Sequence, residues 1–453
     1  MRRSWGIFLL WLLALAFALG TGRDLAFNLF YFVTGVILIA LWWAWSSLRG
    51  LALRRITRSQ RSQVGKYFEE SFELSNQARG AKLWVEVQDL SDLPGHQVSR
   101  VVNSLRGRAT SRWQVRTLCQ QRGRFALGPL ALTSGDPLGI FRFTRKLPGT
   151  TSLVVTPAII PIPAFIQPTG YLPGGEAMRR RTPYVTASIA GVREYAPGDS
   201  FNRIHWPSSA RIGRLISKEF ELDPLADVWI FLDMYGPAQA QSPWMPKVTD
   251  PLPWLTRRAD RVELPPSTVE YGATIAASLA NHFLQSDREI GFLSYAQNRE
   301  MVQPDRGERQ LTRLLEILAV IQGAGAIPLA QVLASEGAHM ARHTTLVVIT
   351  PAADHHWVSA LRGLRARGVQ GIGILLAGNT FGAAPDWQPV LGDLQASGLP
   401  SYLVKRGDDL GVALSGQPGG FGQTRRWSVP VQASRLGGTR HGDADAVHRA
   451  VTR

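Results

Sequence analysis

The sequence predicts a protein with a doubly wound, mostly parallel α/β domain, a small all-β sandwich before it and an apolar N-terminal pair of helices. Three observations predict this order. Two uncharged apolar runs precede residue 50, short alternating strands follow over 64–157, and buried-type strands alternate with helical segments over 225–415. Alternation of strands and helices is typical of a parallel sheet covered on both faces. The 453 residues allow two or three domains.

The N-terminal residues 1–50 predict a transmembrane hairpin. Residues 25–48 carry no charge and would span about 36 Å as a helix, enough to cross a bilayer. Residues 5–20 are also uncharged but reach only about 24 Å. A signal peptide is the alternative for this first run, but a stronger span follows it directly and no cleavage site stands out.

The distribution of charge predicts the orientation of the hairpin. Arginines precede the first run, and a basic segment follows the second, whereas the connection between them is short. Positive residues stay on the cytoplasmic side, so we expect a multi-pass plasma-membrane protein with both termini in the cytoplasm. The basic flank also suits anionic lipids and explains part of the net charge of +16. Basic residues are not interleaved with aromatic ones, so we expect no nucleic-acid partner.

The soluble part divides into four regions. Residues 64–157 alternate in the manner of strands and predict the β-sandwich. Residues 158–224 form a connector whose prolines oppose regular structure and whose Arg179–Arg181 run predicts a solvated arm. Residues 225–415 form the α/β domain, with a proline-rich loop over 236–266 whose role the sequence leaves open. Residues 416–453 predict a disordered basic tail.

Residues 192–211, "VREYAPGDSFNRIHWPSSAR", concentrate charged, aromatic and turn residues. Asp199 can cap a short helix over 201–205 that Pro207 ends, and a strand follows with Ile216 and Lys218 on one face. Two interpretations stay open: a structural clasp, in which the charges surround Tyr195 and Trp206 and hold the connector on the α/β domain, or a partner-binding surface.

This stretch resembles the signature of the domain-of-unknown-function-58 family. The match runs in register, except that His205 stands where the family usually has Asp, which weakens any general-base role. The segment Arg122–Phe143 adds to the resemblance. The signature residues that we select are Arg193, Tyr195, Gly198, Asp199, Arg203, Trp206, Ser209 and Arg211.

The resemblance implies a fold and a function. The α/β domain is expected to be von Willebrand factor A-like, and the protein to work with a MoxR-type AAA ATPase as an assembly factor or chaperone for an unidentified client protein. No catalysis and no cofactor are expected. The alternatives are a hydrolase that uses Asp199, His205 and Asp233, or a metal-dependent adhesion module.

A von Willebrand factor A-like domain implies a magnesium site with the pattern D-x-S-x-S after the first strand. Here Asp233 is followed by Met234 and Tyr235, and both serines are absent. Thr350 and Asp354 could add ligands, but the set is incomplete, so we predict a degenerate site without metal. In this interpretation Asp233 and Asp354 cap helices at the ends of strands.

Overall fold

A computed structural model of the chain describes most of the residues that the sequence analysis singles out. The described residues are 2–165, 180–182, 189–196, 204–222, 227–246, 262–342 and 344–416. The tail after residue 416, the signature residues Gly198, Asp199 and Arg203, and part of the connector lie outside them.

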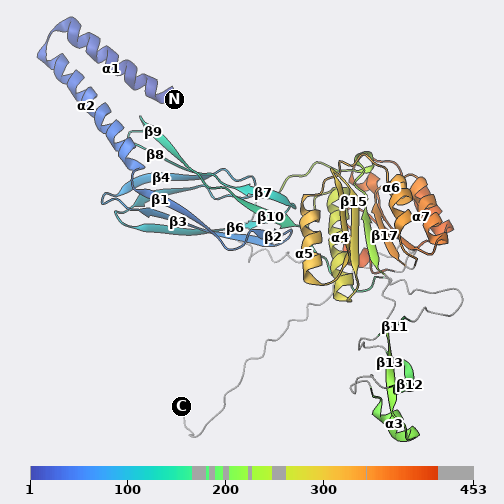
Figure 1. Ribbon diagram of the computed structural model, residues 1–453. Helices are drawn as coiled ribbons and strands as arrows, with labels where there is room; N and C mark the ends of the chain where they lie inside the picture. The colour runs from blue at the N-terminus through green and yellow to red at the C-terminus, as the bar shows by residue number, and fades with distance from the viewer. Residues whose placement is uncertain are drawn as a thin grey trace, which may run out of the picture. The chain divides into compact units, whose positions relative to one another are not determined.

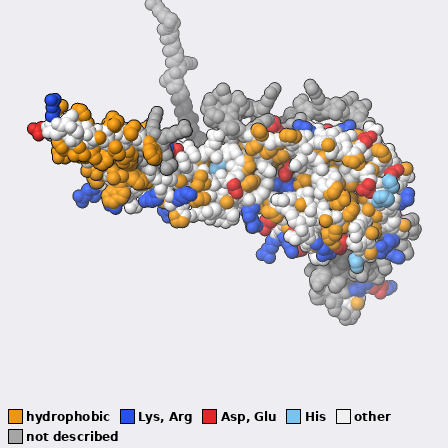
Figure 2. Space-filling model, turned by 90° about the horizontal axis from the view of Figure 1, so that it is seen from above, with side chains coloured by type: hydrophobic (Ala, Val, Ile, Leu, Met, Phe, Trp, Pro, Cys, Tyr) orange, Lys and Arg blue, Asp and Glu red, His pale blue; other side chains and the backbone are white. Residues whose placement is uncertain are grey.

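The N-terminal residues form two helices, α1 (Arg2–Thr21) and α2 (Asp24–Ser47), that pack against each other (Figure 1). Trp11 Nε1 in α1 donates to Thr34 Oγ1 in α2 over 2.9 Å. Within the described residues, α2 is the helix long and apolar enough to cross a membrane, whereas the apolar part of α1 is shorter. Exposed apolar side chains cover the pair (Figure 2).

Residues 51–156, all of which the structure describes, contain ten strands and no helix. They form three sheets, in the orders β1-β3-β6, β2-β10-β7 and β5-β4-β8-β9. Phe72 and Trp113 of the first sheet face Val85, Val87 and Leu132 of the third across one core. The strands are β1 (Leu51–Thr57), β2 (Arg61–Gln63), β3 (Tyr67–Asn76), β4 (Lys82–Asp89), β5 (Arg100–Leu105), β6 (Thr110–Leu118), β7 (Gly123–Leu127), β8 (Leu130–Gly135), β9 (Arg142–Leu147) and β10 (Thr151–Thr156).

The predicted start of the sandwich at residue 64 is wrong, because β1 already pairs with β3 from Leu51 onward. The arginines of this strand belong to the basic segment that is expected to flank the membrane. Arg55 is instead partly buried, with its side chain 9% exposed beside the carboxylates of Glu70 and Asp89. A basic residue inside a strand can therefore belong to a buried ion pair rather than to a solvated flank.

The predicted mostly parallel sheet is confirmed. Six strands lie in the order β16-β15-β14-β17-β18-β19, and all are parallel except β16, which pairs antiparallel with β15. The central strand β14 is buried on both faces, as its continuous apolar run predicts. The strands are β14 (Val228–Leu232), β15 (Ile290–Tyr295), β16 (Arg299–Asp305), β17 (Thr345–Thr350), β18 (Gln370–Leu376) and β19 (Ser401–Val404).

Helices cover both faces of this sheet (Figure 1). On one face lie α4 (Thr268–Gln285) and α5 (Gly307–Val320), together with the short helices α8 (Gly378–Phe381) and α10 (Leu410–Ala413). On the other lie α6 (Leu329–Glu336), α7 (His356–Ala366) and α9 (Gln388–Ala396). Alternate residues of a strand point to opposite faces of the sheet and pack in two separate hydrophobic cores: Ile230 lies in the core on the first face and Phe231 in the core on the second.

The connector contains a third folded element, a small sheet built on the predicted strand that includes Ile216 and Lys218. Strand β13 (Ile216–Leu222) pairs antiparallel with β11 (Arg180–Thr182) and with β12 (Ile189–Glu194). Arg180 and Arg181, expected in a solvated arm, therefore belong to a strand. The helix α3 (Trp206–Ile212) precedes β13. We call β11, β12, α3 and β13 the signature sheet.

Candidate functional site

The helix of the signature sheet begins where the sequence analysis expected a helix to end. Pro207 lies in the first turn of α3, and His205 caps the helix by accepting a hydrogen bond from the Ser208 backbone N–H. Proline is tolerated in a first turn because its missing N–H would have no intrahelical partner there. Pro207 therefore lies in the first turn of α3 and does not end a helix, which corrects the expected boundary.

Buried polar contacts join α3 to β13. The Ser209 hydroxyl donates to the carbonyl of His205 and accepts from the backbone N–H of Ile216 over 2.9 Å. Ser209 is 8% exposed. This signature residue therefore fixes the angle between the helix and the strand, which is a structural role.

Other signature residues lie open to solvent. Trp206 is 61% exposed and Ile212 on the same helix is 55% exposed. Val192 on β12 and Leu215 before β13 are exposed as well. The clasp interpretation places Asp199 and Arg203 among the charges around Trp206; these two residues lie outside the described residues, so the clasp stays a prediction. An exposed group of large apolar residues is typical of an interaction site.

The charges of the described signature residues also point outward. Glu194 pairs with Arg214 over 2.7 Å, and both side chains are about two-thirds exposed. Arg193 donates to the backbone carbonyl of Glu194, and Arg211 is exposed. Surface ion pairs of this kind contribute little to stability, about 0–1 kcal/mol. Tyr195 is half-buried, and its backbone N–H donates to the carbonyl of Leu215.

A second candidate site lies at the carboxyl ends of β14 and β17, where the resemblance placed a degenerate magnesium site. Asp233 is 6% exposed, and the Thr350 hydroxyl donates to its carboxylate over 2.6 Å. The backbone N–H of Tyr235 donates to the other carboxylate oxygen. Burial raises the pKa of Asp233 to about 6, against the lowering effect of these two hydrogen bonds, and the charge of Asp354 raises it further. Asp233 thus joins two strand ends and does not cap a helix, which corrects the expected role.

The other residues considered for this site act locally. Asp354 accepts from the backbone N–H of His356, the first residue of α7, whereas the cap position of this helix is occupied by His355. His205 bonds the Ser208 hydroxyl, and Asp233 bonds the Thr350 hydroxyl; Asp199, the third residue of the hydrolase alternative, lies outside the described residues. Among the residues that the structure describes, no group of three acidic, histidine or cysteine side chains could hold a metal.

Arg122 provides a contact that the sequence analysis missed. It follows β6, lies buried, and donates through Nε to the carbonyl of Leu318 over 2.7 Å and through Nη2 to the carbonyl of Ile321. Its Nη1 pairs with Glu270 on α4. Carbonyls at a helix end have no intrahelical donor, so this guanidinium completes the end of α5. These contacts join the sandwich to the α/β domain, and we call them the Arg122 clasp.

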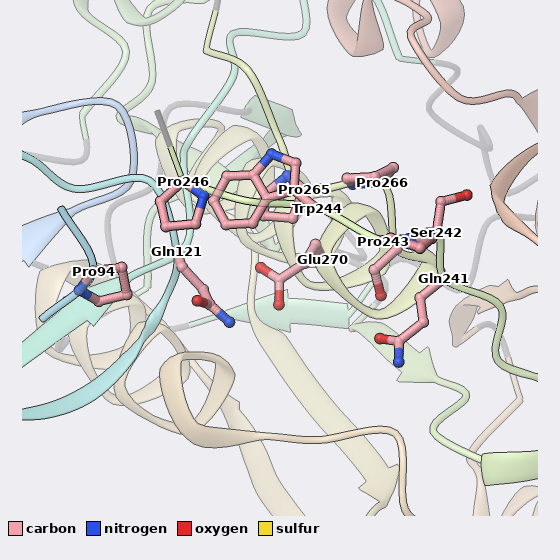
Figure 3. Close-up of a pocket in the computed structure, with 11 residues that line it drawn as sticks. Pro94, Gln121, Gln241, Ser242, Pro243, Trp244, Pro246, Pro265, Pro266 and Glu270 are labelled. Atoms are coloured by element: carbon pink, nitrogen blue, oxygen red, sulfur yellow. The ribbon is translucent and has the colours of Figure 1, made fainter. Parts of the chain in front are cut away.

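A groove of about 580 Å³ lies beside this clasp (Figure 3). The carboxylate of Glu270 points into it between side chains from distant parts of the chain, including Gln121 and Trp244. Five prolines add apolar walls: Pro94, Pro243, Pro246, Pro265 and Pro266. Because Arg122 already pairs with Glu270, the groove does not present a free acid–base pair.

The sequence comparisons agree with the signature resemblance. The sequence model of the family described as "Protein of unknown function DUF58" matches residues 191–249. This match supports the assignment of the chain to that family.

A curated relative supports the same assignment. "Uncharacterized protein YeaD" of Bacillus subtilis (strain 168) is 21% identical over 240 residues, which cover 51% of this chain and 50% of that protein. The chain thus spans about half the length of this relative.

Solved structures resemble the chain only weakly. The CARDB domain of PF1109 from Pyrococcus furiosus matches with 13% identity and a TM-score of 0.17, over 23% of this chain and 94% of that one. The pilus adhesin SpaC of Lactobacillus rhamnosus GG matches with 7% identity and a TM-score of 0.28, over 43% of this chain and 29% of that one. These scores carry no argument about fold or function.

Proposed function

We propose that this protein is a membrane-anchored, cytoplasm-facing assembly factor that binds other proteins through its signature sheet. The observation that carries the proposal is the exposure of large apolar side chains on α3, where Trp206 and Ile212 are more than half exposed within the family signature. Tryptophan and arginine are the residues that most often dominate binding energy at protein interfaces. Arg211 and Arg214 lie on either side of Ile212 in the sequence.

The resemblance to the domain-of-unknown-function-58 family supports a MoxR-type AAA ATPase as the partner. In this proposal the α/β domain is von Willebrand factor A-like, and its parallel sheet with helices on both faces is compatible with that fold. The apolar helix α2 supports a membrane anchor, and the paired α1 supports a second span. We assign no chemistry to the site at Asp233, because its carboxylate accepts a hydrogen bond from the Thr350 hydroxyl.

Binding to the ATPase tests the proposal. The full-length protein in lipid nanodiscs is immobilised, and the MoxR-type ATPase of the same organism is titrated in biolayer interferometry. Trp206→Ala should weaken binding by at least about tenfold, the effect of removing an interface tryptophan. Its melting temperature should hardly change, since the indole is 61% exposed.

A matched control separates the signature sheet from nonspecific binding. Trp84→Ala removes a tryptophan of similar exposure, 64%, from the sandwich and should leave the affinity unchanged. Equal affinities of the wild type and the Trp206 variant would contradict the assignment of the interface to α3. An absence of binding by the wild type would contradict the ATPase partner.

A further inference from the structure

We infer that the turn between β8 and β9, residues 135–141, is a second membrane contact, which inserts Leu138 among the headgroups of an anionic bilayer. The inference rests on the proposed membrane anchor. The β8–β9 turn would add a second contact, made by the folded sandwich, to the contact that the anchor makes with lipid. The partner is the bilayer surface itself, because the turn lies beside the end of α2.

The end of α2 marks the level of the membrane interface. Three tryptophans, Trp42, Trp43 and Trp45, lie in its last two turns, and Arg49 stacks on Trp45 with its Cζ 3.3 Å from the ring centroid. Tryptophans and basic residues gather at the headgroup level of membrane proteins. Leu48 and Leu51 already belong to the core of the sandwich, so the sandwich begins at this level.

The β8–β9 side of the sandwich packs against the hairpin. Helix α2 contacts both β8 and β9, and Lys82 Nζ on the neighbouring strand β4 donates to the carbonyl of Ser46 near the end of α2. The ring of Phe141 meets the ring of Phe8 in α1 edge-on, with centroids 6.4 Å apart. Phe8 lies about 9 Å along α1 from Arg2, at the helical rise per residue. The base of the turn therefore touches the apolar part of the hairpin.

The turn is rigid and presents an apolar tip. Asp136 is 3% exposed, and its carboxylate accepts hydrogen bonds from the backbone N–H groups of Leu138, Ile140 and Phe141. Gly139 has a φ of 70°, which a residue with a side chain rarely adopts. Leu138 at the tip is 65% exposed. A fixed apolar residue beside the membrane level gains by leaving water.

The loops near the end of α2 carry positive charge. Backbone hydrogen bonds tie the loop at Gln77 to Gly50 and the loop at Arg108 to Ala78. The only acid in segments 49–50, 76–81, 105–110 and 135–143 is Asp136, which is buried against backbone donors. Such a basic rim favours anionic lipids. Its exposed arginines are Arg49, Arg79, Arg106, Arg108 and Arg142.

Site-specific fluorescence in nanodiscs tests the inference with the full-length chain. The one native cysteine, Cys119, is buried, so a new cysteine can be labelled selectively with an environment-sensitive NBD dye. We compare Leu138→Cys with Val412→Cys, a control on α10 with a similar exposure of 69%. Leu38→Cys in α2 reports on the anchor itself. The nanodiscs contain phosphatidylglycerol and a lipid that carries a doxyl quencher near the headgroup.

The expected result is a blue-shifted emission at position 138 that the lipid quencher reduces strongly, with no such change at position 412. Replacing phosphatidylglycerol with phosphatidylcholine, or introducing Arg106→Gln together with Arg108→Gln, should reduce the quenching at position 138.

Three results would overturn the inference. Quenching at position 38 but not at 138 would reject the turn as a membrane contact and leave the anchor intact. A dye at position 138 that is shielded from aqueous iodide but not quenched by lipid would indicate a protein contact instead. An unquenched dye at position 38 would reject the anchor and, with it, the membrane contact.

Discussion

Replacing Arg122 with alanine should destabilise the protein more than any surface charge does. The change leaves the carboxylate of Glu270 without its cation and removes the donors to the carbonyls of Leu318 and Ile321. Arg122 is 7% exposed, so water replaces these contacts poorly. Removing one partner of a buried ion pair costs about 3–5 kcal/mol. At about 2–4 °C per kcal/mol, a loss of 3 kcal/mol lowers the melting temperature by roughly 6–12 °C.

A thermal unfolding scan of the full-length protein in detergent, followed by circular dichroism, measures the effect. Arg61→Gln is the matched control, because Arg61 on β2 pairs with Glu316 on α5 but both side chains are exposed. That exposed pair should contribute less than about 1 kcal/mol. Glu270→Gln should cost less in the Arg122→Ala background than in the wild type, since the carboxylate has then lost its partner. A melting temperature for Arg122→Ala equal to that of Arg61→Gln would refute the clasp.

Three further predictions concern pH, metal and topology. Burial alone would lower the pKa of His96, but hydrogen bonds and charges from Asp89 and Glu70 outweigh burial and raise this pKa. The contribution of His96 to the free energy of unfolding should therefore be complete below about pH 6.5 and should be lost as the pH rises through the raised pKa. A urea titration at several pH values measures this, and His96→Gln should remove the dependence. Calorimetry with millimolar Mg²⁺ should show no binding; a tight site that Asp233→Ala abolishes would contradict this. Protease added outside intact cells should leave residues 51–416 uncut, and cleavage there would show the opposite orientation.

Hydrophobic patterning predicted the sheet of the α/β domain because its strands are covered on both faces. Strand β17, with every residue buried, reads as a continuous apolar run. The edge strand β16 escaped prediction, since its sequence "REMVQPD" is mostly polar and one of its sides has no neighbouring strand. Strand β1 escaped for a different reason: the partners of Arg55 are distant in sequence.

The signature residues could be found from the sequence, but their exposure could not. Whether Trp206 is covered depends on the packing of α3 on β13, which local propensity does not determine. The Arg122 clasp could not be predicted from the sequence either, because Glu270, Leu318 and Ile321 come close to Arg122 only in the folded structure. A lone arginine after a strand carries no pattern that indicates a helix end nearly 200 residues away.

The direct passage from α2 into β1 has a mechanical consequence. Leu48, one residue after the helix, and Leu51, the first residue of the strand, pack in the same core, so no flexible tether separates the apolar helix from the sandwich. A force applied to the α/β domain would be transmitted to α2 through the Arg122 clasp and through the direct connection between α2 and β1. Packed side chains, and not a flexible linker, would carry this force. A partner that works by applying force could therefore tilt or strain the helix instead of first extending a linker.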